Sequence, residues 1–109
     1  MTFYSKLKKT GEDEDDWSSY VENIYYMTDS NRLYYISMLD GKCRHCYNDF
    51  LQFHKVPEIS KDMVLEYLNH TLKSLQSDYF KAMAKANNLD DTDTIRRLKK
   101  FYKRISNDG

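Results

Sequence analysis

The chain has 109 residues, with 17 basic and 17 acidic side chains, so its formal net charge is zero. That length fits one domain, and three Gly and one Pro supply few of the turns that a β-sandwich or barrel needs. No apolar run approaches the roughly 18 residues of a transmembrane helix, and the start lacks the apolar core of a signal peptide. We therefore expect a cytoplasmic protein with no membrane contact.

The first quarter of the chain combines a charged tail with an amphipathic pattern. Residues 1–16 contain few apolar side chains, which predicts a flexible tail. Apolar residues then recur at helical spacing and predict an amphipathic helix to about residue 27, through Trp17, Tyr20, Val21, Ile24 and Tyr25.

Residues 33–39 fit two structures. Their β-branched and aromatic content, followed by Asp40-Gly41, fits a strand that enters a hairpin turn. Their apolar spacing also fits a helix that Gly41 terminates. We favour the helix, because the neighbouring segments have helical patterns.

The second half of the chain has clearer helix signals, since apolar spacing, capping residues and turn residues agree. The first predicted segment is a helix at 46–54 that Pro57 ends. A second helix is N-capped by Ser60, with an apolar stripe from Val64 to Met83 that is interrupted near 74–78. After a turn at Asn87-Asn88, a final helix has Ile95, Leu98, Tyr102 and Ile105 on one face.

Together these patterns predict a mainly α fold, a small single-domain helical bundle over residues 17–109 behind the tail of residues 1–16. A short hairpin or knuckle around residues 33–46 is the alternative local structure.

Two cysteines separated by two residues suggest a metal site. Cys43 and Cys46 could turn both thiolates toward one zinc ion, with His54 and His70 as the remaining ligands of a tetrahedral set. A zinc shared between two chains is a further alternative. Without metal, the thiols would be small buried apolar groups at a helix start. A second CxxC is missing, so we expect no cofactor, with zinc as the alternative.

The segment Asp40-Gly41-Lys42-Cys43-Arg44-His45-Cys46 resembles a zinc knuckle of the phage recombination endonuclease VII family, whose members resolve Holliday junctions. Later short motifs of that family are similar to Pro57-Glu58-Ile59 and Tyr67-Leu68 here, so the likeness runs over roughly residues 32–105. It implies a helical scaffold, dimerisation and a phage source. Only one of the family's two Cys pairs is present here, and the sequence fits either of them. The family's Asp/His-rich catalytic segment is missing. The resemblance therefore does not imply nuclease activity, and a residual metal-dependent nuclease is only an alternative.

Basic residues cluster near the C-terminus. They could contact the phosphates of a nucleic acid or the acidic groups of a protein. Alternatively, they simply complement the dipole of a solvated helix whose first turn is acidic. The candidate nucleic-acid-binding residues are Arg96, Arg97, Lys99, Lys100, Lys103 and Arg104.

Ten tyrosines are more than a small core can bury, so some should lie at the surface. Tyr is common at interface hot spots because it combines a rigid face with a hydroxyl group; the alternative is a half-buried core position. The candidate protein-interface residues are Trp17, Tyr20, Tyr25, Tyr26, Tyr34 and Tyr35.

The sequence has no Gly-rich phosphate loop, nucleophile elbow or zinc-protease helix motif, so we expect no enzyme. We predict a non-enzymatic helical interaction protein, a phage-type accessory or inhibitor that docks on a protein partner in the host cytosol and could form a homodimer. The alternative is a relative of endonuclease VII that binds branched DNA through its C-terminal basic helix.

Overall fold

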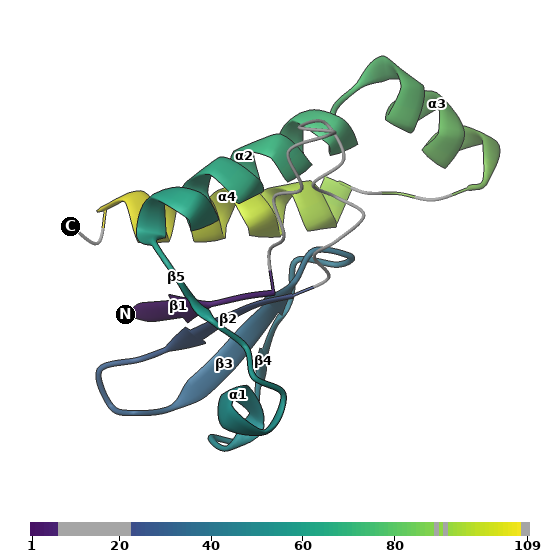
Figure 1. Ribbon diagram of the computed structural model, residues 1–109. Helices are drawn as coiled ribbons and strands as arrows, with labels where there is room; N and C mark the ends of the chain where they lie inside the picture. Colours follow the sequence, from purple (N-terminus) through teal and green to yellow (C-terminus); the bar gives the residue numbers. More distant parts are fainter. Residues whose placement is uncertain (7–22, 89, 91, 108–109) are drawn as a thin grey trace, which may run out of the picture.

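The computed structural model describes residues 1–6, 23–88, 90 and 92–107 and has an α+β fold (Figure 1). Its strands form one antiparallel sheet, and its two longest helices lie on one face of that sheet. The elements in chain order are β1 (Thr2–Tyr4), β2 (Asn23–Met27), β3 (Leu33–Ser37), β4 (Cys43–His45), α1 (Phe50–Phe53), β5 (Glu58–Ile59), α2 (Lys61–Leu75), α3 (Asp78–Ala86) and α4 (Thr92–Asn107).

The predicted mainly α bundle is wrong, because the first half of the chain is built from strands. The five strands pair in the order β4-β3-β2-β1-β5. The tail predicted at residues 1–16 also begins inside the fold, since Thr2–Tyr4 pairs with both β2 and β5. Residues 7–16 lie outside the described residues.

Strand β2 replaces the last part of the helix predicted at residues 17–27; residues 17–22 lie outside the described part of the chain. Within β2 the burial alternates, with Ile24 and Tyr26 buried and their neighbours half-buried. This period of two is that of a strand. The helical interpretation relied on Ile24 and Tyr25 following earlier apolar residues at spacings of three and four. A spacing of four is also compatible with a strand.

Strand β3 replaces the helix favoured at residues 33–39, and the hairpin alternative for residues 33–46 is confirmed. Tyr35 lies opposite Arg44 across this hairpin and opposite Tyr25 on the other side. Tyr and Ile favour strands because their side chains pack well on a pleated surface. Pairing on both sides therefore outweighs the local helical spacing.

The helix predictions in the second half are largely confirmed. Helix α2 begins after Ser60, whose Oγ accepts a hydrogen bond from the Met63 amide at 3.2 Å. The predicted interruption separates α2 from α3, and the chain turns at Asn87 and Asn88 before α4. The helix predicted at residues 46–54 is limited to the single turn of α1, Phe50–Phe53.

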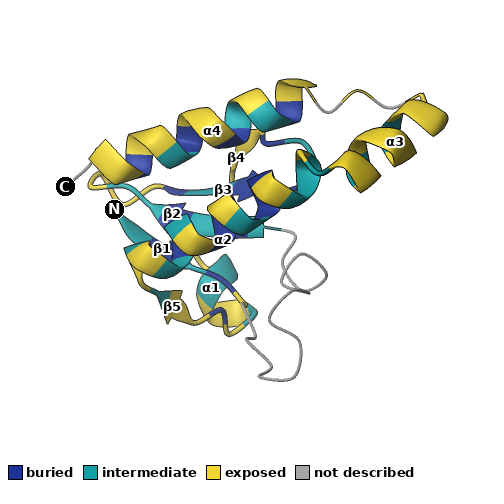
Figure 2. Ribbon diagram, turned by 90° about the horizontal axis from the view of Figure 1, so that it is seen from above, coloured by how far each residue is buried: buried dark blue, intermediate teal, exposed yellow. Residues whose placement is uncertain are grey.

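Helices α2 and α4 cover one face of the sheet and enclose the core with it (Figures 1 and 2). Helix α4 contributes a stripe at spacings of three and four residues, and α2 contributes a similar stripe. The fully buried side chains of this core include Ile24, Ile36, Val64, Tyr67, Leu68, Leu98 and Ile105.

Helix α3 differs from the other long helices because none of its residues is buried. It extends away from the sheet beyond the end of α2 (Figure 2), and Tyr79 on it is 77% exposed. Among the described residues, no helix has both the length and the apolar composition to cross a membrane.

Candidate functional site

A groove of about 440 Å³ lies between the β3–β4 turn and one flank of α4. Among the described residues that line it, four carry a positive charge and none carries a carboxylate. The other described lining residues contribute a glycine, a thiol and an aromatic ring. The described lining residues are Gly41, Lys42, Cys43, Arg97, Lys100, Phe101 and Arg104.

The core determines which face of α4 forms the groove. Thr94, Leu98, Phe101 and Ile105 are buried, and this stripe fixes the rotation of the helix about its axis. Side chains one position before or three after a buried residue lie on the flank beside the stripe. The flank toward the hairpin carries Arg97, Lys100 and Arg104.

These three cations follow one another along about 10 Å of helix, at a rise of 1.5 Å per residue. The other predicted cations, Arg96, Lys99 and Lys103, are exposed and do not line the groove. The structure therefore divides the six predicted residues into a groove set and an outward set.

Lys42 lines the groove from the hairpin and was not among the predicted site residues. Its contribution depends on the turn at Asp40 and Gly41, which brings β4 back along β3 beside α4. The Asp-Gly pair was the available signal for this turn. Nothing local in the sequence indicated that α4 would lie next to it.

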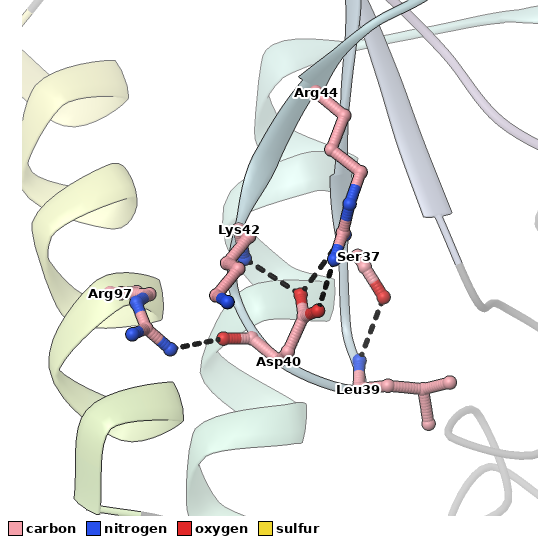
Figure 3. A network of polar contacts seen from close by, with 6 residues as sticks. All are labelled: Ser37, Leu39, Asp40, Lys42, Arg44 and Arg97. Carbon is pink, nitrogen blue, oxygen red and sulfur yellow. Dashed lines mark hydrogen bonds and ion pairs between the residues drawn. The ribbon is translucent and has the colours of Figure 1, made fainter.

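Hydrogen bonds centred on Asp40 attach the hairpin turn to α4 (Figure 3). Arg97 Nη1 donates to the Asp40 carbonyl oxygen at 3.0 Å, between residues 57 positions apart. The Asp40 carboxylate accepts from the Lys42 amide at 2.9 Å and from the Arg44 guanidinium. The Arg44 guanidinium holds the pKa of Asp40 below its usual value. This network orders the turn and positions one wall of the groove.

Gly41 permits the close approach of this turn to α4. Its φ is +71°, in the left-handed region that side chains disfavour. A Cβ atom at this position would lie 2.8 Å from Arg97 Cβ and 3.0 Å from the Thr94 carbonyl oxygen. The glycine therefore sets the width of the groove at its hairpin end.

Aromatic rings lie beneath the cations. Arg104 lies 6.0 Å from the centroid of the Tyr26 ring, at the outer limit of a cation–π contact. Tyr26 also contacts Phe101, with ring centroids 5.3 Å apart. Burial, together with a hydrogen bond to the Cys43 thiol, raises the pKa of Tyr26 above its ordinary value, so its hydroxyl stays protonated. Tyr26 and Phe101 thus form buried packing beneath the cations, and Phe101 also borders the groove.

The acidic first turn of α4 lies apart from the groove. Asp93 pairs with Arg96 at 3.1 Å, and the Asp90 carboxylate accepts a hydrogen bond from the Thr92 amide at 3.0 Å. The groove begins at Arg97, on a different face from Arg96. An anion that approaches the flank of α4 therefore meets cations, whereas one that approaches the helix end meets carboxylates.

The predicted zinc ligands lie in different environments. Cys43 is exposed on β4, and Cys46 is buried just after it, with its amide donating to the Leu33 carbonyl. Side chains three positions apart in extended chain lie on opposite faces, whereas both thiolates of a knuckle turn toward one ion. The His54 ring centroid is 4.2 Å from that of Phe50, and His70 is half-buried on α2. The described residues include no group of three or more His, Cys, Asp and Glu side chains able to hold a metal ion.

The predicted interface tyrosines divide between the two faces of the sheet. Tyr26 is 3% exposed beneath the helices, and Tyr34 stacks on it with centroids 5.7 Å apart. Tyr25 and Tyr35 lie on the opposite face, also 5.7 Å apart. Trp17 and Tyr20 fall outside the described residues. Tyr26 therefore serves the core, whereas Tyr25 and Tyr35 belong to a second aromatic surface.

Comparison with known proteins gave no match to any family model, to any curated protein or to any solved structure.

Proposed function

We propose that this protein binds nucleic acid without catalysing a reaction and holds the phosphate backbone in the groove between the β3–β4 turn and α4. The convergence of Lys42, Arg97, Lys100 and Arg104 on one hollow supports this proposal most strongly. Like charges repel one another, so four cations with no carboxylate among the described lining residues favour an anionic ligand.

An extended polyanion fits this groove better than a small anion does. The cations are spread along two turns of α4, so several phosphates can be contacted in succession. Arg96, Lys99 and Lys103 add positive charge on the neighbouring exposed face of the same helix. Their long-range attraction would speed the approach of a polyanion without fixing its position. Phe101 is the one aromatic residue among the described lining residues, and with Tyr26 it packs beneath the cations.

A salt titration tests this function. Fluorescence anisotropy with a labelled oligonucleotide should show binding whose affinity decreases steeply as salt rises. Its log–log slope should lie between about −2.1 and −3.6 if three to four phosphates are contacted, the steeper values applying to a duplex. Binding independent of salt would contradict contact with phosphates. An absence of binding to both single strands and duplexes would contradict the function itself.

Helix α3 favours a second candidate function, the docking of another copy of this chain. Tyr79 and Met83 lie one turn apart and are 77% and 40% exposed. Antiparallel packing of two α3 helices would place Asp78 of each copy beside Lys85 of the other. Such a symmetric contact satisfies both charges and covers the apolar residues. A phage-type accessory role stays a prediction. A dimer formed through α3 would be compatible with it.

Sedimentation velocity over a range of concentrations tests this dimer. The unaltered chain should associate, and the double variant Tyr79→Glu, Met83→Glu should remain monomeric because the contact would then bury like charges. Lys99→Glu, on an exposed face of α4, is the control and should associate like the unaltered chain. A chain that stays monomeric at the highest concentration would contradict the α3 contact and leave the groove proposal intact.

A further inference from the structure

A continuous series of aromatic rings lies on the sheet face opposite α2 and α4. Tyr25 contacts Tyr35 at 5.7 Å on the sheet, and the Phe50 ring of α1 stacks on Tyr25 at 4.9 Å. From Phe50 the contacts branch to Tyr47 at 5.5 Å and to His54 at 4.2 Å. Phe53 follows His54 at 5.0 Å. We call these six residues, Tyr25, Tyr35, Tyr47, Phe50, His54 and Phe53, the aromatic series.

Burial differs along the aromatic series. The inner rings of Tyr25, Tyr35 and Phe50 are half-buried against one another. The outer rings of Tyr47 and Phe53 are 56% and 77% exposed. Exposing two large rings to water costs free energy in proportion to their exposed apolar area. Their inner neighbours hold them in place, so a flat ligand would meet rings that are already ordered.

Lys55 supplies positive charge at the exposed end of the aromatic series, because it directly follows the Phe53-His54 pair and is itself exposed. Arg44 is paired with Asp40, and Lys42 lines the groove. For a ligand that offers flat rings joined by negative charges, the groove therefore supplies most of the positive charge and the aromatic series supplies the rings.

The groove and the aromatic series meet at strand β4, which is the edge of the sheet. Lys42 and Cys43 line the groove, and Arg44 is the next residue, paired across the sheet with Tyr35 of the aromatic series. Side chains alternate along a strand, so Cys43 and Arg44 lie on opposite faces. A strand of nucleic acid that leaves the groove over this edge would reach the aromatic series directly.

We propose that the aromatic series stacks the bases of a single-stranded nucleic acid whose phosphates occupy the groove. This inference rests on the proposed function and names its substrate class. Base–aromatic stacking tolerates any sequence, because every base has a π face. Bases within a duplex already stack on each other and cannot reach a protein ring unless they are splayed out. The aromatic series therefore selects single strands.

Fluorescence anisotropy tests this inference by comparing the binding of a labelled oligothymidylate with that of a duplex of the same length. The oligothymidylate has about 10 nucleotides, within the range that single-strand binders cover. We expect Phe53→Ala and Tyr47→Ala each to weaken single-strand binding roughly tenfold, a loss typical of one stacked base. Both side chains are largely exposed, so the variants should fold. Phe53→Tyr keeps a ring for stacking at the same exposed position and is the matched control, expected to bind like the unaltered chain.

The salt slope separates this inference from the proposed function. Phe53→Ala should weaken binding without changing the slope, because no phosphate contact is lost. The aromatic series would be overturned as a base site if salt-dependent binding were unaltered in both ring variants and equal for single strands and duplexes. The groove proposal would survive that result. An absence of salt-dependent binding would instead overturn the groove.

Discussion

Replacing Lys100 with Glu is expected to weaken nucleic-acid binding about 100-fold at low salt. Lys100 is exposed on α4 and lines the groove between Arg97 and Arg104. The substitution removes one phosphate contact and places a carboxylate among three remaining cations. The salt slope should also become shallower by about 0.7 to 0.9, the change for one phosphate contact. Anisotropy titrations at several salt concentrations measure both quantities.

Lys103→Glu is the matched control, because it makes the same change of charge on the same helix, outside the groove lining. Long-range attraction decreases equally in both variants, so their difference isolates the groove. We expect Lys103→Glu to weaken binding by less than about fivefold. Equal losses in the two variants would mean that net charge, rather than the groove, attracts the ligand.

Gly41→Ala is expected to lower the free energy of unfolding by about 2 to 3 kcal/mol. Placing a side chain at a left-handed φ costs about 1 kcal/mol, and overpacking against Arg97 Cβ and the Thr94 carbonyl adds about 1 to 2 kcal/mol. Such a loss is a large fraction of the stability of a small domain. Urea denaturation followed by circular dichroism measures it.

The reverse change at Asn88 separates the two contributions at Gly41. Asn88 also has a positive φ, 55°, but it lies exposed in the turn after α3 and already carries a Cβ atom. Asn88→Gly removes that atom and should stabilise the fold by at most about 1 kcal/mol, the conformational part alone. If the loss in Gly41→Ala were no larger than the gain in Asn88→Gly, the turn would not be held tightly against α4. The position of Lys42 in the groove wall would then lose its support.

The helices could be predicted from the sequence because their signals are local. The Ser60 cap and the apolar stripes of α2 and α4 act over a few residues, and the structure confirms them. The hairpin of β3 and β4 had a local signal and was an alternative, whereas β1 and β5 have two or three residues each and depend on distant partners, so they could not be predicted. Thr2–Tyr4 is a strand only because β2 and β5 lie on either side of it. A period of two cannot be recognised over so short a segment.

The candidate site was predictable in part for the same reason. The basic composition of α4 is local and was recognised. The burial of one stripe of α4 in the core decides which of its cations lie in the groove. These are Arg97, Lys100 and Arg104, and the other three point outward. The contribution of Lys42 required knowledge that the hairpin turn contacts α4 across 57 positions in sequence, between Asp40 and Arg97. The aromatic series likewise depends on contacts between β2, β3 and α1, which lie far apart in the sequence.

Alkylation of Cys43 tests occupancy of the groove most directly. Cys43 lines the groove and is exposed, whereas Cys46 is buried and serves as an internal reference. Mass spectrometry can follow the modification of each thiol by a maleimide, with and without saturating oligonucleotide. Occupied groove walls should slow the alkylation of Cys43 severalfold, and high salt should restore its rate by releasing the ligand. An unchanged Cys43 rate under conditions where anisotropy shows full binding would contradict the groove as the nucleic-acid site.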